Sequence, residues 1–130
     1  ISLVNAGTIR DNFDDPYVTK ADINSALPFT TSTLIKTTLT KKQLIDTLNW
    51  CALSTSFGKV SPGMMQVSGL EYTVNPDFKV TNVHILNPDG SIKLNLDKCD
   101  DDKEITVVYD VFLATGVAGL SEMKKDIVIA

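Results

Sequence analysis

The sequence predicts an α+β fold: one domain spanning residues 1–130, formed by a mixed sheet with flanking helices. Its 130 residues are a usual size for a single domain, and a hydrophobic fraction of 43% is ordinary for a globular protein. About six or seven segments have strand patterns and two or three have helix patterns, in mixed order along the chain. Because strands and helices do not alternate strictly, a doubly wound parallel sheet is not expected.

A first, short helix is predicted from its capping signal. Thr19 and Asp22 form a T-x-x-D arrangement, which predicts a helix over about residues 20–26. Pro28 is expected to end this helix, because proline cannot continue the helical hydrogen-bond pattern.

The second helix follows a capping box formed by Thr40 and Gln43. Apolar residues then recur at the spacing of one helix face, which predicts an amphipathic helix over about residues 41–53. These apolar residues are Leu44, Ile45, Leu48, Cys51 and Ala52. The polar residues expected on the solvent-facing side are Lys42, Asp46 and Asn49.

The remaining regular segments have the β-branched or alternating patterns of strands. They span about residues 1–4, 33–39, 65–74, 80–86, 91–96, 104–113 and 127–129. Gly69 interrupts the third of them, which predicts a bulge or a close backbone approach. Residues 87–90 form a strong turn signal, so the strands on either side are expected to pair as a hairpin.

The charge balance argues against nucleic-acid binding. The formal net charge is −4, and no cluster of basic residues is present to neutralise phosphates. The densest charge run, residues 97–104, is mostly acidic and is expected to be a solvated turn. No window approaches the roughly 18–20 consecutive apolar residues of a membrane span. The chain begins at Ile1 rather than Met, which predicts a processed or truncated product.

Two cysteines, Cys51 and Cys99, are too few for a disulfide framework or a zinc cage. Cys51 falls among the apolar residues of the second helix, so a buried thiol is expected there. Whether the two cysteines pair stays open, because the sequence does not give the distance between their Cα atoms.

The residues of a self-contained catalytic or metal site are not visible in the sequence. His84 is the single histidine and is expected to be an ordinary outward-facing strand residue. None of the G-x-S-x-G, Walker, H-E-x-x-H or C-x-x-C patterns occurs. The acidic residues of the run 97–104 resemble a calcium loop only loosely, because the glycine and closing glutamate are misplaced. We therefore expect no catalytic residue, metal ligand or cofactor in this chain, which leaves recognition as its function.

Four short segments, in this order, carry motifs that recur together in one known family. They are Asn5–Arg10 (NAGTIR), Ala26–Phe29 (ALPF), Gln66–Thr73 (QVSGLEYT) and Asp110–Ala114 (DVFLA). The Thr40 helix lies between the second and the third, also as in the family. With this order and spacing, the chain resembles the C-terminal domain of the 5'-nucleotidase family, which includes ecto-5'-nucleotidase and bacterial UDP-sugar hydrolase.

The resemblance implies a division of labour. In this family an N-terminal metallophosphatase-like domain holds two divalent metal ions and hydrolyses the substrate. The C-terminal domain binds the nucleotide and carries it to the metals by interdomain rotation. The chain therefore looks like the nucleotide-recognising domain of a 5'-nucleotidase-type phosphohydrolase, whose ligand is a nucleoside phosphate or a related phosphoester. Members are commonly periplasmic, extracellular or surface-anchored, so that location is expected by resemblance alone.

The resemblance also assigns roles to five residues. Phe29 and Phe112 match the two aromatic residues that clamp the base, and stacking contributes about 1–3 kcal/mol per base. Arg10, whose planar guanidinium suits phosphate oxygens, would meet the phosphate. Asn5 would make a polar contact near the base, and Gly69 would allow a close backbone approach to the ligand.

Without the resemblance, the same residues have simpler interpretations. The two phenylalanines would be ordinary core residues, since a Phe after Pro or within a strand is usually buried. Arg10 would form a surface ion pair with Asp11 or Asp14, which contributes little to stability.

The chain also departs from the family pattern. Residues 116–120 read GVAGL where active members have G-G-D-G-F/Y, so Ala118 stands in place of the aspartate that binds ribose. Loss of that charge-assisted hydrogen bond is expected to weaken ribose recognition by roughly 1.5–3 kcal/mol. The family's helix before the first strand, with further arginines, is missing, which predicts N-terminal truncation or divergence.

Two other hypotheses therefore stay open. The chain would be a non-catalytic binding module that has lost ribose recognition and serves a protein partner or a structural role. In the other hypothesis, the chain would be an inert relic fragment.

Overall fold

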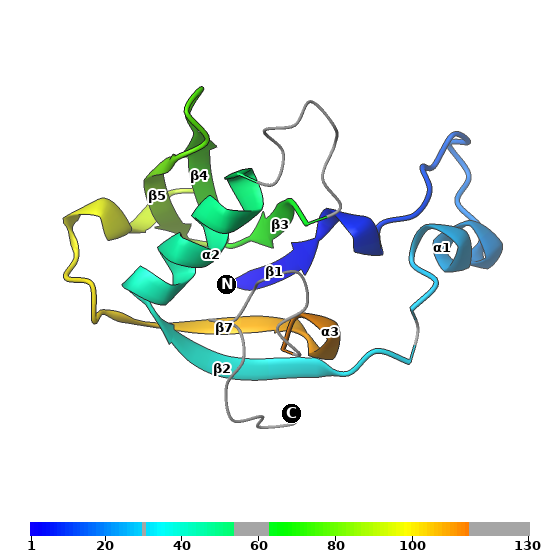
Figure 1. The fold of residues 1–130 in the computed structure, drawn as a ribbon. Coiled ribbons are helices and arrows are strands. Elements are labelled where there is room, and N and C mark those ends of the chain that lie inside the picture. Colours follow the sequence, from blue (N-terminus) through cyan, green and yellow to red (C-terminus); the bar gives the residue numbers. More distant parts are fainter. Residues whose placement is uncertain (30, 54–62, 115–130) are drawn as a thin grey trace.

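The larger of the two sheets contains the strands whose carboxyl ends lie at the candidate site. In the computed structural model, which describes residues 1–29, 31–53 and 63–114, this sheet has the strand order β2-β7-β1-β3 (Figure 1). Its strands are β1 (Ser2–Asn5), β2 (Leu34–Thr40), β3 (Met65–Ser68) and β7 (Glu104–Asp110). β7 lies between β2, which it pairs with antiparallel, and β1, which it pairs with in parallel.

The smaller sheet is an antiparallel meander in the order β4-β5-β6. Its strands are β4 (Leu70–Val74), β5 (Val80–Leu86) and β6 (Ile92–Asn95). The helices are α1 (Lys20–Ala26), α2 (Lys41–Leu53) and α3 (Val111–Ala114), with the 3-10 turns η1 (Ala6–Thr8) and η2 (Leu96–Lys98). The predicted α+β fold with a mixed sheet and flanking helices is confirmed, as is the hairpin between β5 and β6.

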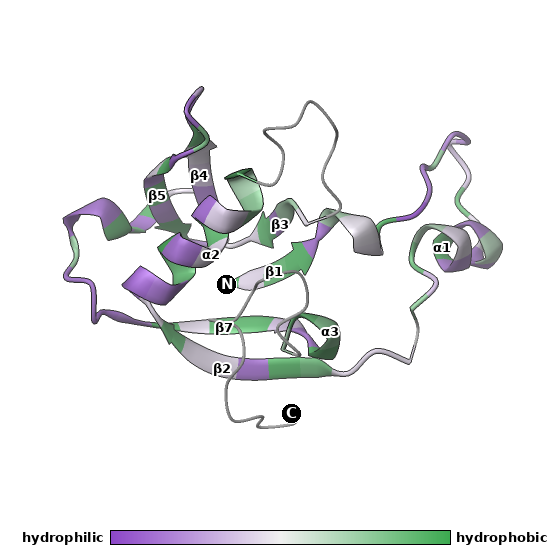
Figure 2. Ribbon diagram, in the orientation of Figure 1, coloured by the Kyte–Doolittle hydropathy of each residue, from purple (hydrophilic) through white to green (hydrophobic). Residues whose placement is uncertain are grey.

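Helix α2 begins where β2 ends and connects the two sheets. Its capping box is confirmed: the Thr40 hydroxyl accepts from the Gln43 N–H at 3.2 Å, and the Gln43 side chain accepts from the Thr40 N–H at 3.0 Å. The helix contacts β2 and β3 of the larger sheet and β5 of the smaller sheet. Hydrophilic residues lie along its outer side (Figure 2). The buried side is formed by Leu44, Thr47, Leu48, Cys51 and Ala52.

One residue that was expected on the solvent-facing side of α2 faces the protein instead. Asn49 is half-buried, and its Oδ1 accepts a hydrogen bond of 2.7 Å from the N–H of Val80, the first residue of β5. The strand end would otherwise leave a backbone donor without a partner. Lys42 and Asp46 do lie on the exposed side, where they form an ion pair of 2.5 Å.

The predicted single strand over residues 65–74 is wrong. The chain leaves the larger sheet after β3 and enters the smaller sheet at β4, so Gly69 forms a corner between sheets rather than a bulge within one strand. Its φ of +71° lies in the left-handed region, which glycine adopts without a Cβ clash.

The predicted strand over residues 104–113 is too long. β7 ends at Asp110, and residues 111–114 form α3, so Phe112 lies on a helical turn and not on a strand. The Asp110 carboxylate accepts from the Phe112 N–H at 2.6 Å, a local capping bond that competes with continued strand pairing. Capping therefore outweighs the β propensity of the residues that follow.

The first helix agrees with its prediction. α1 spans Lys20–Ala26, and both hydrogen bonds between Thr19 and Asp22 are present at its start. The predicted strand at residues 127–129 lies outside the described residues.

Both cysteines are present as thiols, Cys51 buried and Cys99 half-buried. Burial raises the pKa of the Cys51 thiol to about 11, because the apolar core disfavours the thiolate. The expectation of a buried Cys51 thiol is confirmed.

Cys51 is expected to resist alkylation in the folded protein. With its pKa at about 11 and its side chain enclosed, iodoacetamide at pH 8 should label Cys99 first and Cys51 only after unfolding. Peptide mass spectrometry over a time course measures both rates. Equal labelling rates in the absence of denaturant would contradict the burial of Cys51.

Thr47 is expected to be replaceable with a gain in stability. Its Oγ1 is buried and, within the described ranges, has no hydrogen-bond partner. The nearly isosteric Thr47→Val substitution removes this desolvated hydroxyl and should raise the free energy of unfolding by about 1 kcal/mol. Urea denaturation measures the change, and Thr47→Ala, which also removes packing, should destabilise the protein. A less stable valine variant would show that the hydroxyl does find a partner.

Candidate functional site

The site residues gather where the two parallel strands of the larger sheet end. Leu3 of β1 pairs with Tyr109 of β7, so the carboxyl ends of these strands lie at the same edge. Asn5 ends β1 there and Asp110 ends β7. Ligands commonly bind at the carboxyl ends of parallel strands, because loops and helix starts meet there.

Asp110 connects this edge to the loop before β2. It is 8% exposed, and its two carboxylate oxygens accept from different segments. Oδ2 accepts from the hydroxyl of Ser32, and Oδ1 accepts from the N–H of Phe112 at 2.6 Å. The Ser32 N–H in turn donates to the carbonyl of Phe29 at 3.1 Å. The backbone segments of the two phenylalanines are therefore joined at one carboxylate.

Phe29 and Phe112 are not core residues, so their simpler interpretation is wrong. Phe29 is 48% exposed and Phe112 is 49% exposed. Leu113 and Ala114, which follow Phe112 on α3, are buried and hold the helical turn to the sheet. Both rings are therefore partly exposed apolar surface on linked segments.

Arg10 lies against one of these rings. Its guanidinium carbon is 5.3 Å from the centroid of the Phe29 ring, within the range of a cation–π interaction. Its N–H donates at 2.8 Å to the carbonyl of Ala26, which ends α1. Among the described residues it forms no ion pair with Asp11 or Asp14.

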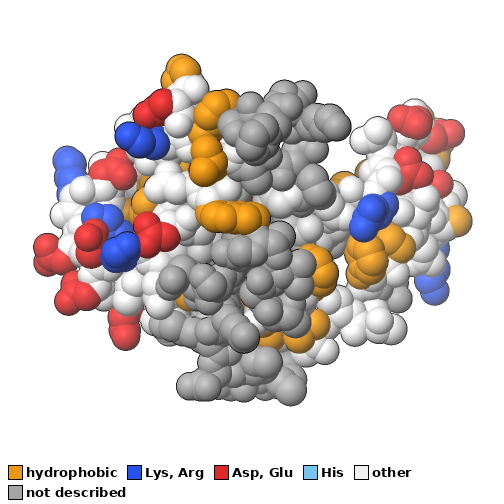
Figure 3. Space-filling view, viewed as in Figure 1, with side chains coloured by type: hydrophobic (Ala, Val, Ile, Leu, Met, Phe, Trp, Pro, Cys, Tyr) orange, Lys and Arg blue, Asp and Glu red, His pale blue; other side chains and the backbone are white. Residues whose placement is uncertain are grey.

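The carboxylate of Asp11 is engaged elsewhere. It accepts hydrogen bonds from the Ser25 hydroxyl at 2.8 Å and from the Asn12 N–H at 2.9 Å, and these bonds lower its pKa. Acidic side chains gather over the loop that precedes α1, beside the segment that carries Arg10 (Figure 3). A phosphate at Arg10 would therefore meet one cation at the border of an acidic surface.

Asn5 and Gly69 lie at opposite ends of β1. Asn5 is 9% exposed, and its Oδ1 accepts from the Thr8 hydroxyl at 2.8 Å, which ties it to η1 and the segment that leads to Arg10. Gly69 lies beside Ile1, at the amino end of the strand. The structure brings Asn5 to the site edge and leaves Gly69 away from it.

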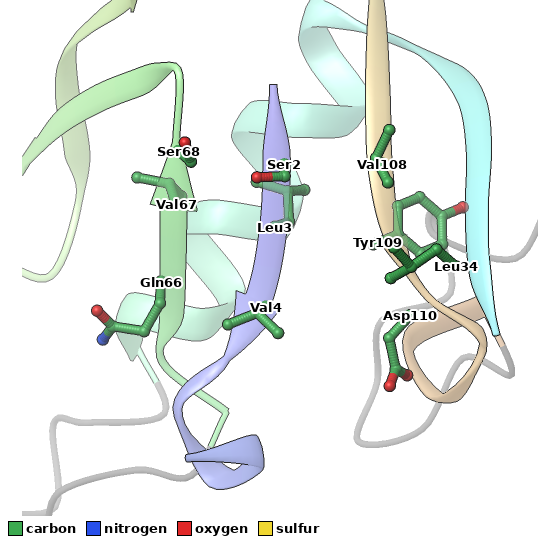
Figure 4. A pocket seen from close by; sticks show the side chains of 10 residues that line it. All are labelled: Ser2, Leu3, Val4, Leu34, Gln66, Val67, Ser68, Val108, Tyr109 and Asp110. Carbon is green, nitrogen blue, oxygen red and sulfur yellow. The ribbon is translucent and has the colours of Figure 1, made fainter. Parts of the chain in front are cut away.

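A groove that the sequence did not indicate lies on the larger sheet. Its volume is about 350 Å³, and Asp110 lies at one end of it (Figure 4). Its lining is mostly apolar and comes from all four strands. The lining residues are Ser2, Leu3, Val4, Leu34, Gln66, Val67, Ser68, Val108, Tyr109 and Asp110.

His84 has a partner that the sequence did not predict. Its Nδ1 lies 2.7 Å from Oε1 of Glu71, the residue opposite it on β4, and its side chain is only 16% exposed. The sequence did not reveal this partner, because cross-strand register is needed to pair the two side chains.

Within the ranges that the structure describes, no three His, Cys, Asp or Glu side chains are grouped so that they could hold a metal ion. In the same ranges, the helices fall short of the length and apolar character needed to cross a membrane.

Neither Asp110 nor Ser32 is among the site residues predicted from the sequence. Asp110 belongs to the DVFLA segment, and an Asp directly before an apolar helix start is a capping signal that could have identified it. The Ser32 contact spans 78 positions in the sequence, so only the fold reveals it.

Comparison with protein families gives a match to the family described as 5'-nucleotidase, C-terminal domain, over residues 1–126. Among solved structures, a 5'-nucleotidase precursor from Thermus thermophilus is 26% identical, with a TM-score of 0.76 over 96% of this chain and 24% of that one. NAD nucleotidase from Haemophilus influenzae is 22% identical, with a TM-score of 0.72 over 94% and 22%.

A putative 5'-nucleotidase from Staphylococcus aureus, solved with alpha-ketoglutarate, is 16% identical, with a TM-score of 0.70 over 99% and 26%. At these identities the last two comparisons show the fold alone. This chain spans about a quarter of the length of each of these three structures. Comparison with curated proteins gives no match.

Proposed function

We propose, from the premise that this chain belongs to the 5'-nucleotidase C-terminal domain family, that it is the nucleotide-recognising domain of a phosphohydrolase. The observation that carries the proposal is the pair of half-exposed rings, Phe29 and Phe112, on segments joined at Asp110. We call these two rings the aromatic clamp.

The clamp suits a planar base. A purine or pyrimidine placed between two aromatic faces is stacked on both sides. Removing an aromatic ring that stacks on a base costs about 1–3 kcal/mol of binding free energy. Because the guanidinium of Arg10 lies over one face of the Phe29 ring, the base would stack on the opposite face. Asn5, at the same sheet edge, would contribute a polar contact near the base.

Arg10 would meet the phosphate. It is the single arginine of the chain, and its guanidinium offers paired donors that match phosphate oxygens. Its guanidinium lies 5.3 Å from the centroid of the Phe29 ring, which supports a phosphate contact close to a base stacked on that ring. Gly69 has no part in this arrangement, because it lies at the other end of β1.

Hydrolysis would take place on a separate N-terminal metallophosphatase domain with two divalent metal ions. The residues of this chain would bind and orient the phosphoester and present it to those metals. A periplasmic, extracellular or surface-anchored location is part of the same proposal, since it derives from the family alone.

A second candidate is a binding module that has lost ribose recognition and serves a protein partner or a structural role. It is favoured by Ala118, which stands where the family has an aspartate and lies outside the described residues. A chain that binds neither adenosine nor AMP would favour this candidate over the first.

Removing one ring of the clamp should abolish most of the base affinity. Phe112→Ala is expected to raise the Kd for adenosine by about tenfold or more, because one stacking face is lost. Isothermal titration calorimetry measures it. The control is Ile92→Ala, which removes a side chain of similar exposure, 55%, from the smaller sheet. Unchanged adenosine affinity in the folded Phe112→Ala variant would rule out the clamp.

Removing the guanidinium should affect AMP more than adenosine. Arg10→Ala is expected to weaken AMP by about tenfold and adenosine by much less, because one charge-assisted contact to phosphate is lost. The matched control is Lys20→Ala, which removes an exposed cation at the start of α1. Titration calorimetry with both ligands measures the difference, and equal losses for the two ligands would exclude a phosphate role for Arg10.

A further inference from the structure

The carboxylate of Asp110 is the element that joins the two halves of the aromatic clamp. One oxygen accepts from Ser32, three residues after Phe29, and the other accepts from the N–H of Phe112 itself. The Val111 N–H also donates to the Thr33 carbonyl at 2.9 Å, which extends the β2–β7 ladder by one pair. The Ser32 and Val111 bonds therefore connect the Phe29 loop with the Phe112 turn, and the Phe112 bond orders that turn around the same carboxylate.

Because the Asp110 carboxylate is buried, it depends on the hydrogen bonds that it accepts. Asp110 is 8% exposed, and within the described residues no lysine, arginine or histidine forms an ion pair with it. A buried carboxylate needs hydrogen bonds to offset the loss of water. The side chain is therefore held to the two donors it has, and any separation of the two segments breaks one of these bonds.

The rings themselves are not fixed by packing in the core. Each is about half exposed, at 48% and 49%, in contrast to Leu113, which is 1% exposed on the same helical turn. The separation of the two rings therefore depends on the backbone to which they are attached. The Ser32–Asp110–Phe112 hydrogen bonds, together with the buried Leu113 and Ala114, hold that backbone in place.

We propose that Asp110, with Ser32, is the positioning residue that sets the separation of the aromatic clamp. The proposal rests on the proposed function, because it assumes that a base binds between the rings. Stacking requires the two faces at a fixed spacing, so a clamp held in advance binds with a smaller ordering cost. Asp110 does not touch the base; it acts through the two segments it holds.

The role depends on geometry and not on charge, and this distinguishes it from other roles of a buried carboxylate. In Asp110→Asn, Oδ1 can still accept from the Phe112 N–H, and Nδ2 can donate to the Ser32 hydroxyl. In Asp110→Ala both links are lost, and in Ser32→Ala one is lost. Asparagine is therefore expected to rescue the function that alanine removes.

The test is an NMR titration of the 130-residue chain with adenosine, which is uncharged and so insensitive to the charge removed at residue 110. The Kd is expected to rise about tenfold or more in Asp110→Ala and about three- to tenfold in Ser32→Ala, in line with two and one lost hydrogen bonds. Asp110→Asn is expected to stay within about threefold of the wild type.

The matched control is Asn95→Ala. Asn95 caps η2 by accepting from the Asp97 N–H at 2.9 Å, so its loss removes a comparable cap from the smaller sheet. Thermal unfolding of each variant shows that it is folded. Asn95→Ala is expected to lower the unfolding temperature and to bind adenosine with wild-type affinity. That result would show that a loss of stability alone does not weaken binding.

Four results would overturn the proposal. A folded Asp110→Ala chain that binds adenosine like the wild type removes the positioning role and leaves the proposed function intact. If Asp110→Ala does not fold, wild-type affinity in Ser32→Ala has the same meaning. An Asn variant as weak as the Ala variant shows that charge, and not geometry, is needed. A wild-type chain without saturable shifts removes the proposed function, and this proposal with it.

Discussion

The pairing of β7 with β2 is the constraint on which the rest of this structure depends. The two strands are in register from Leu34 opposite Asp110 to Thr40 opposite Glu104, and β1 adds to the other side of β7 in parallel. Because alternate residues of β7 are buried, a shift of one residue would turn its apolar side chains to solvent. The register therefore fixes where β7 ends, and with it the position of the candidate site.

Both ends of this ladder continue directly into helices. At one end, Thr40 is the last residue of β2 and also the cap of α2, which packs against strands of both sheets. At the other end, Asp110 is the last residue of β7 and accepts from the N–H of Phe112 on α3. One cap begins the core helix and the other begins the turn that carries an exposed ring, so the same physical device serves stability at one end and, in the proposed function, recognition at the other.

Local signals in the sequence predicted the parts of the fold that depend on neighbouring residues. The capping boxes at Thr19 and Thr40 gave both helix starts, because a cap is a contact between residues three apart. The sheet change at Gly69, the pairing of His84 with Glu71 and the contact of Ser32 with Asp110 were not predictable, since each depends on tertiary register. The candidate site residues were predicted from the family resemblance. Asp110, which joins the Phe29 and Phe112 segments, was identified only from the structure.

The central claim is that a base binds between Phe29 and Phe112. The most direct measurement is a set of intermolecular nuclear Overhauser effects between adenosine and the isotope-labelled chain. The account predicts contacts from the adenine H2 and H8 protons to the ring protons of both phenylalanines. Contacts to neither ring, or contacts only to residues of the sheet-face groove such as Val4 and Val108, would contradict it.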